Sequence, residues 1–486
     1  MNFVRPFASA ARLALLCCGL ALAPLASGQG QAPSPLPEMG DPSARVLTPQ
    51  AERRLGEALL RELHAKGLLA EDPLVTGYVE SLGKRLAANS DLGPGAIRFF
   101  VVRDRAINAF AAPGGVIGIH TGLILASQTE SELAAVIAHE IAHVGQRHMA
   151  RTYEAAGQMQ ITNAVALLAA ILLGQVDGEL GEAALAATLG GSAQSQINFI
   201  RANEEEADRI GIRILADAGL DPYGMPNFFG RLQQNQRLYG DALPEFLRTH
   251  PINVSRIASA TDRASRMPPV TPRDQTTYQL IKLRLEALGD RPSDQRAEIF
   301  EARIRRGDET ARYGLAIVQL ERGNGRAALE TIAPLLEAEP DRAEYLLLRA
   351  RALAASGNRD AAVDRYREAL SIYPDHPALV QAYAQLLLDL GRPARVRELL
   401  TAQINAGHVQ RAYYQLLHDA AIQLRDEVAA RRARAELLLL DGRNSEAAEQ
   451  LRGALDLAEG YDSARIAARL AEVERRLAEE NRTDAM

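Results

Sequence analysis

The sequence predicts an α+β protein that is mainly α-helical. One domain is expected to pack a small sheet on helices, and a solenoid of helix pairs is expected to follow it. Two short runs of β-branched and aromatic residues, at 97–102 and 116–120, predict the sheet. A capped amphipathic helix follows them in sequence. Near the C-terminus, glycines recur every 34 residues, which predicts the solenoid. A chain of 486 residues is too long for a single domain.

The overall composition is that of a globular protein. Hydrophobic residues make up 47% and charged residues 24% of the chain. The net charge is -6, and the sequence contains no block of basic residues. Nucleic acid is therefore not expected as a partner, because nucleic-acid binding depends on clustered positive charge.

The N-terminus has the pattern of a secretory signal peptide, which we place at residues 1–28. Arg5 and Arg12 precede or open an apolar run, and small residues follow at 26–28. A retained membrane anchor is the alternative. Cys17 and Cys18 lie inside this segment. The mature chain is thus expected to contain neither a disulfide nor a thiol ligand.

The next part of the chain predicts a flexible linker and then a folded domain. Residues 29–50 are rich in Pro, Ser and Gly and have no apolar period, which is typical of a linker. Residues 51–266 are expected to form the first domain. Helical spacing over 52–89 is interrupted by Asp72-Pro73, and turn-forming residues at 108–115 separate the two predicted strands.

The helix that follows carries the first candidate site. Thr129 and Glu132 form a T-x-x-E capping box, so a helix is expected to begin there. Within it, His139, Glu140 and His143 form an H-E-x-x-H pattern. Residues four apart share one helix face, so the two imidazoles can hold one Zn²⁺, and Glu140 can take a proton from its bound water. The alternative is a buried helix whose histidines bind only neighbouring groups.

A second predicted helix, at 201–220 and ended by Gly219, supplies further candidates. Glu204 and Asp208 are four residues apart and share a helix face. Glu204 can be the third zinc ligand, and Asp208 can accept the N–H of a ligating histidine. The alternative is a set of solvated acids near a helix start.

Two more segments complete the first domain and its boundary. The apolar run 164–173 is too short to span a bilayer. It is expected to be a buried helix, or a helical hairpin that covers the cleft or touches a membrane surface. Three prolines within 267–276 predict an interdomain linker.

The remaining residues, 277–486, predict tetratricopeptide-like repeats. Gly323, Gly357 and Gly391 are 34 residues apart, as are Pro340 and Pro374. A helix–turn–helix period of this length is the signature of that repeat. The register weakens after about residue 410, while helical patterns continue to 479. We expect three regular repeats and two degenerate ones.

Four segments together resemble peptidase family M48, a family of zinc metallopeptidases. They are HEIAH, EEEAD, NAFAAPGG followed by IHTGL, and HPINVSRI, which begin at residues 139, 204, 108 and 250. The signal peptide before them and the repeats after them are similar to those of the periplasmic β-barrel assembly-enhancing protease group of Gram-negative bacteria.

The resemblance implies a gluzincin-type metallopeptidase domain with one Zn²⁺ per chain. His139, His143 and Glu204 would ligate the metal, Glu140 would be the catalytic base, and Asp208 would support a ligand from behind. His250 and Arg256 map onto the family's late motif. His250 would either stabilise the oxyanion or bind zinc as a regulatory fourth ligand. The alternative is that it is a helix N-terminal or packing histidine before Pro251.

The implied function is that of a periplasmic endopeptidase. Its substrates would be unfolded or misassembled envelope and outer-membrane proteins, and chaperone activity is compatible with the same architecture. The repeats would bind the outer-membrane assembly machinery, and 164–173 would make any peripheral membrane contact. An edge strand at 116–120 would pair with extended substrate, and His120 would have a structural role or face that substrate. The alternative is a chaperone or docking scaffold whose metal site is kept latent by His250.

Overall fold

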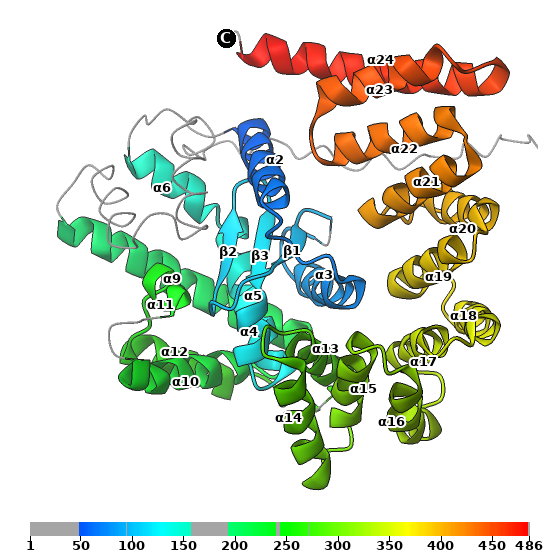
Figure 1. The fold of residues 1–486 in the computed structure, drawn as a ribbon. Helices are drawn as coiled ribbons and strands as arrows, with labels where there is room; N and C mark the ends of the chain where they lie inside the picture. The colour runs from blue at the N-terminus through cyan, green and yellow to red at the C-terminus, as the bar shows by residue number, and fades with distance from the viewer. Residues whose placement is uncertain (1–47, 94, 157–192, 240–243, 272, 485–486) are drawn as a thin grey trace, which may run out of the picture. The chain divides into compact units, whose positions relative to one another are not determined.

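The computed structural model describes residues 48–93, 95–156, 193–239, 244–271 and 273–484. The predicted signal peptide, nearly all of the predicted linker, and the apolar run 164–173 lie outside these ranges. Within them, no helix is both long enough and apolar enough to cross a membrane. The first part of the described chain contains three strands and a set of helices (Figure 1). These elements are α2 (Pro49–Ala65), α3 (Pro73–Ala87), β1 (Arg98–Val102), β2 (Ala109–Ala112), β3 (Val116–His120), α4 (Thr121–Ala126), α5 (Glu130–Gly145), α6 (His148–Ala156), α9 (Ala193–Asp217), α10 (Gly224–Tyr239), α11 (Glu245–Thr249) and α12 (Val254–Ser265).

The sheet has the order β1-β3-β2, with β3 parallel to β1 and antiparallel to β2. Both runs predicted as strands are confirmed, whereas β2 falls within the segment predicted to be a turn. Only residues 113–115 form that turn, and Gly114 and Gly115 adopt positive φ values of 78° and 70° there. Because β3 is paired on both sides, the expectation that 116–120 forms an edge strand is wrong. Among the described residues, β1 and β2 are the edge strands.

Alternating side chains cover the two faces of this sheet. Val101, Ala109 and Ile117 belong to the large core that contains the residues of α5. Val102 and Phe110 belong to a smaller core completed by Leu59, Leu63 and other residues of α2. The sheet therefore separates α2 from α5, and α5 is buried along nearly its whole length.

Helix pairs fill the rest of the described chain, as the 34-residue period predicts (Figure 1). Gly323, Gly357 and Gly391 have φ values of 77°, 89° and 65° and form the turns inside successive pairs. Helices continue past residue 410, where the sequence register weakens. The helices are α13 (Thr276–Ala287), α14 (Ser293–Arg305), α15 (Ala311–Glu321), α16 (Gly325–Ala338), α17 (Ala343–Ala355), α18 (Arg359–Ile372), α19 (Pro377–Asp389), α20 (Pro393–Asn405), α21 (Arg411–Leu424), α22 (Glu427–Leu440), α23 (Asn444–Leu455) and α24 (Gly460–Asp484).

Candidate metal centre

Helix α5 begins where the capping box predicts. Thr129 is its N-cap in an extended conformation, and its side chain accepts a hydrogen bond from the backbone N–H of Glu132. The Glu132 carboxylate accepts from the backbone N–H of Gln128, one residue before the position expected for a capping box. This cap fixes the start of a helix that buries His139 and Glu140 almost completely.

Helix α9 lies against α5 and brings the second set of candidates to it. It ends before Gly219, as predicted, but begins at Ala193, earlier than the predicted start at 201. The close approach depends on Gly211, where a Cβ atom would lie 3.1 Å from the backbone nitrogen of His139. Asp208 and Glu204, one and two turns before Gly211, are each only 5% exposed.

The structure brings four candidate ligands from three helical segments together. Donor atoms of His139, His143, Glu204 and His250 all lie within 4.8 Å of one another. His139 Nε2 is 3.0 Å from His143 Nε2, 3.3 Å from His250 Nδ1 and 3.4 Å from a Glu204 oxygen. His250 caps the C-terminus of the short helix α11, and its Nδ1 is 3.0 Å from Glu204 Oε1.

These spacings fit a small, tetrahedrally coordinated cation. Tetrahedral bonds of about 2.1 Å place neighbouring ligand atoms about 3.4 Å apart. The separation from His143 Nε2 to Glu204 Oε1 is likewise 3.4 Å. Imidazole nitrogen and carboxylate oxygen are donors that suit a borderline metal such as zinc. The donor set and the buried setting therefore imply a metal ion.

A bidentate ion pair between Asp208 and Arg256 lies next to the donor set, on the side of His139 Nδ1. Asp208 Oδ1 is 3.0 Å from His139 Nδ1, the nitrogen that faces away from the other donors. Arg256, at the start of α12, reaches both Asp208 oxygens at 2.8 Å and Glu204 Oε2 at 2.9 Å. All these groups are buried. Arg256 thus balances the charge of two carboxylates that burial alone would destabilise.

Burial and hydrogen bonding set opposite protonation preferences in the two histidines of α5. Burial disfavours the charged form of His139, but hydrogen bonds to Asp208 and Glu204 outweigh it and raise the pKa of His139 to about 10. Burial lowers the pKa of His143 to about 3, since Glu204 offsets it only partly. Burial opposes ionisation of Glu204, yet its histidine neighbours hold its pKa well below the ordinary value. A metal ion bound here must displace the proton of His139.

Glu140 lies beside the donor set without joining it. Burial raises its pKa, although neighbouring histidines and a hydrogen bond from the backbone of Ala111 in β2 oppose the shift. Its Oε1 atom is buried, has no hydrogen-bond partner and lies 3.5 Å from His250 Nε2. A carboxylate with one oxygen held and the other unpartnered can accept a proton from a water or substrate group.

His148 belongs to this site although its spacing gave no reason to include it. Its Nδ1 is 2.8 Å from His143 Nδ1, and its Nε2 is 3.1 Å from Glu206 Oε2. Arg151 donates to the same Glu206 oxygen at 2.7 Å. His148 is 4% exposed, and burial lowers its pKa. The run of acids in EEEAD was the only sequence signal for this contact.

Other sequence-based candidates lie elsewhere. His120 is fully buried on the face of the sheet away from α5, where its ring packs edge-on against Phe110 with centroids 6.0 Å apart. That placement agrees with a structural role. The described cluster of metal-ligand candidates includes neither His120 nor His148.

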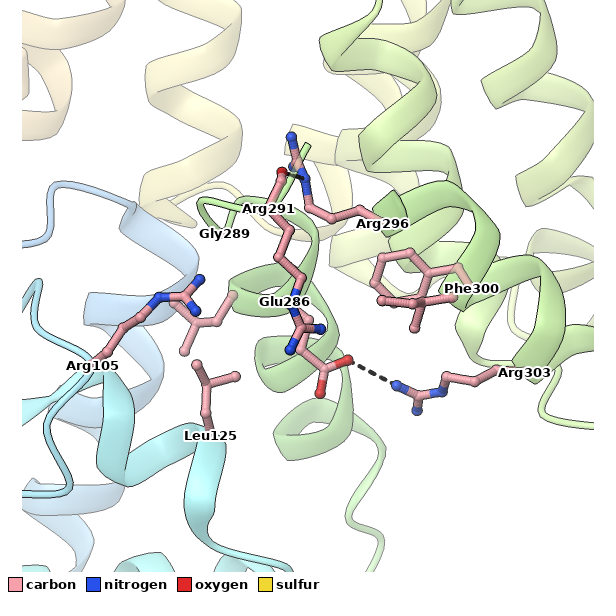
Figure 2. Close-up of a pocket in the computed structure, with 10 residues that line it drawn as sticks. Arg105, Leu125, Glu286, Gly289, Arg291, Arg296, Phe300 and Arg303 are labelled. Carbon is pink, nitrogen blue, oxygen red and sulfur yellow. Dashed lines mark hydrogen bonds and ion pairs between the residues drawn. The ribbon is translucent and has the colours of Figure 1, made fainter. Parts of the chain in front are cut away.

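A cavity of about 330 Å³ lies between helix α4 and the first repeat helices (Figure 2). Leu125 and Phe300 line it, together with Arg105 and Arg291, but none of the candidate metal-site residues does. Its acidic group, Glu286, is paired with Arg303 (Figure 2). The cavity therefore offers no group that completes the chemistry of the metal centre.

An H-E-x-x-H pattern on one helix, completed by a glutamate from a second helix, places this chain in the class of metallopeptidases. Comparison with known proteins agrees. Residues 73–264 match the model of peptidase family M48, and residues 298–352 and 353–420 match a tetratricopeptide repeat model. The chain is 34% identical to the β-barrel assembly-enhancing protease of Escherichia coli strain K12, over 91% of both chains. It is 38% identical to a putative protein of that name from Vibrio cholerae, over 68% of this chain and 69% of the relative.

A more distant relative, metalloprotease LoiP of Escherichia coli, is 28% identical over 46% of this chain and 84% of its own length. The chain belongs to peptidase family M48 and carries tetratricopeptide repeats after the peptidase region. It is therefore a metallopeptidase, which hydrolyses peptide bonds, and the resemblance inferred from its motifs is confirmed.

Proposed function

We propose that this chain is a periplasmic zinc endopeptidase that acts on unfolded or misassembled envelope proteins. One Zn²⁺ per chain would be held by His139, His143 and Glu204. The observation that carries the proposal is the set of donor separations of 3.0–3.4 Å among these side chains. The signal-peptide pattern at residues 1–28 supports export.

The chemistry follows from the positions of the charged groups. His139, His143 and Glu204 would hold a Zn²⁺ ion, whose Lewis acidity would polarise a peptide carbonyl and acidify water. Glu140 Oε1, which no hydrogen bond engages, takes the proton from the attacking water and delivers it to the leaving nitrogen. Asp208 holds His139 in the tautomer that leaves Nε2 free to bind, and Arg256 keeps Asp208 ionised.

The substrate and partner assignments rest on the sheet edge and the repeats. β2 is an edge strand whose backbone contacts Glu140, so an extended peptide pairing with β2 would lie beside the base. Such pairing favours unfolded chains over folded ones. The names of the relatives support a role in β-barrel assembly. The repeats would then bind the outer-membrane assembly machinery. The apolar run 164–173 is the candidate for peripheral membrane contact.

The test is a Glu140→Gln variant, which keeps the shape of the side chain but removes the base. We expect hydrolysis of an unfolded outer-membrane protein to fall by about 10²–10⁴-fold. Zinc, measured by elemental analysis, should remain at one ion per chain. Activity retained at the level of the unchanged protein would contradict the assignment of Glu140.

The second candidate function is a chaperone or docking scaffold with a latent metal site. The position of His250 favours it, since its Nδ1 lies within reach of the other donors and would fill the coordination position that hydrolysis needs. The same Glu140→Gln variant distinguishes the two functions in cells. Loss of envelope function together with cleavage supports the endopeptidase, whereas envelope function that survives without cleavage supports the scaffold.

A further inference from the structure

The hydrogen-bonded chain behind His143 has a defined direction. His143 Nε2 faces His139 and Glu204, so its Nδ1 is the nitrogen that points away from the donor set. This Nδ1 lies 2.8 Å from His148 Nδ1. Beyond it, His148 Nε2 meets Glu206 Oε2 at 3.1 Å. The chain therefore runs from a candidate ligand through a second imidazole to a carboxylate.

Metal binding requires an unprotonated ligand nitrogen, and this requirement determines which nitrogens carry protons along the hydrogen-bonded chain. An imidazole binds a metal through an unprotonated nitrogen, so with Nε2 as the ligand atom His143 must carry its proton on Nδ1. His148 Nδ1 must then accept that proton's hydrogen bond. The remaining proton of neutral His148 is consequently on Nε2, where it donates to Glu206. Every donor in the chain meets an acceptor.

An ion pair between Glu206 and Arg151 holds the carboxylate end of this hydrogen-bonded chain. Arg151, in α6, donates to Glu206 Oε2 at 2.7 Å and to Asn203 Oδ1 at 3.3 Å. Its helix begins at His148 itself, and Glu206 belongs to α9. The contact thus ties the helix after the H-E-x-x-H pattern to the helix that carries Glu204.

The backbone between the two imidazoles is held in an unfavourable conformation. Arg147 connects α5 to α6 with φ at +50°, one of two non-glycine residues with positive φ among the described residues. This left-handed conformation costs an L-residue about 1–2 kcal/mol. Arg147 is held by an ion pair of 2.9 Å with Glu52 of α2. The sharp turn brings the ring of His148 back onto that of His143, with ring centroids 4.7 Å apart.

We propose that His148 is a positioning residue for the metal centre. It fixes the tautomer and ring orientation of His143, with Glu206 and Arg151 as its anchor. The inference rests on the proposed zinc site. It does not make His148 a ligand, because both ring nitrogens are engaged by His143 and Glu206.

The experiment measures the zinc dissociation constant of the full chain by competition with a chromophoric chelator. His148→Phe keeps a ring but removes both hydrogen bonds, and we expect zinc affinity to fall about 10–100-fold. His148→Asn places an oxygen near the position of Nδ1 and keeps the acceptor for His143, so affinity should return to within about threefold of the unchanged chain. Glu206→Ala removes the anchor and should weaken zinc binding in the same direction.

Glu205→Ala is the matched control, because Glu205 is adjacent to Glu206, exposed, and part of the same helix. Its zinc affinity should equal that of the unchanged chain. Zinc affinity unaltered in both His148→Phe and Glu206→Ala would overturn the inference. If His148→Phe does not fold, as judged by circular dichroism, the comparison of Glu206→Ala with Glu205→Ala decides. An unchanged chain that binds no zinc would instead refute the proposed function.

Discussion

At the scale of single residues, Arg256 is a buried cation that contacts both buried carboxylates of the site. Replacing it with alanine leaves Asp208 and Glu204 without their guanidinium partner in a buried setting. In protein stripped of metal by a chelator, we expect the free energy of unfolding to fall by about 3–5 kcal/mol. Urea denaturation measures this change. Added zinc should recover part of the loss, because it offers Glu204 a positive charge.

Arg266→Ala provides the control for this prediction. Arg266 follows the same helix and also pairs with an aspartate, Asp262, at 2.8 Å, but its side chain is 75% exposed. An exposed pair of this kind contributes at most about 1 kcal/mol. Equal destabilisation by the two substitutions would show that burial of the Arg256 pair has no special importance.

Sequence reasoning reached the residues of this site whose spacing is local. His139 and His143 share a helix turn, and Glu204 and Asp208 share another, so their common faces could be read from the i, i+4 rule. The contacts of His148 with Glu206 cross between helices separated by 58 positions. No local pattern encodes such a contact, and the turn at Arg147 that creates it uses a conformation that sequence does not predict for arginine.

At the scale of elements, Gly211 controls how closely α9 approaches α5. A Cβ atom there would lie 3.1 Å from the nitrogen and 3.2 Å from the Cα of His139, and backbone atoms of a buried helix yield little. Gly211→Ala should therefore displace α9, which carries Glu204, and lower zinc affinity. Crowding of this kind costs about 1–3 kcal/mol, which exceeds the gain of roughly 1 kcal/mol in helix propensity. Zinc competition and thermal unfolding measure the two effects.

Gly230→Ala, in α10, is the control, because this glycine has no backbone atom of another helix close to it. A Cβ atom at Gly230 meets nothing within 4 Å. The free energy of unfolding should rise by up to about 1 kcal/mol, and zinc affinity should stay the same. The prediction about α9 fails if both glycine substitutions stabilise the protein and leave zinc binding unaltered.

Helices were easier to predict than the sheet for a physical reason. The caps of α3 and α5 at Asp72 and Thr129 are local hydrogen bonds. The sheet has the order β1-β3-β2, which differs from the order of the strands along the chain. That order depends on pairing between separate segments, which no local sequence pattern reveals. β2 itself, Ala109–Ala112, is short and lacks β-branched residues, so only its pairing with β3 identifies it as a strand.

At the scale of the whole molecule, α13 belongs to two hydrophobic cores at once. Tyr278 and Ile281 pack in the core that also contains the residues of α5, whereas Leu280 and Leu283 pack in the core of the first repeats. The proline-rich segment 267–276 predicted a linker at this point, and α13 begins at its last residue. We propose 267–276 as the boundary in the sequence, although α13 packs against both the peptidase region and the first repeats.

A buried ion pair fastens this shared helix to the peptidase region. Arg284 of α13 is 6% exposed, and its Nε and Nη2 atoms lie 2.7 Å from Asp72 Oδ2. Asp72 also caps α3 through its other oxygen. Arg284→Ala should lower the free energy of unfolding by about 2–3 kcal/mol, since charge-assisted hydrogen bonds of this strength are lost and Asp72 keeps only its capping role. Zinc affinity should not change, because none of the proposed ligands contacts Arg284.

Urea unfolding with and without zinc measures this prediction, and Arg392→Ala is its control. Arg392 pairs with Asp360 at 3.5 Å, but their side chains are 45% and 94% exposed, so its loss should cost less than about 1 kcal/mol. If Arg284→Ala were no more destabilising than Arg392→Ala, the repeats and the peptidase region would not share stability through α13. If it instead weakened zinc binding, the ion pair would act on the metal centre as well as on the fold.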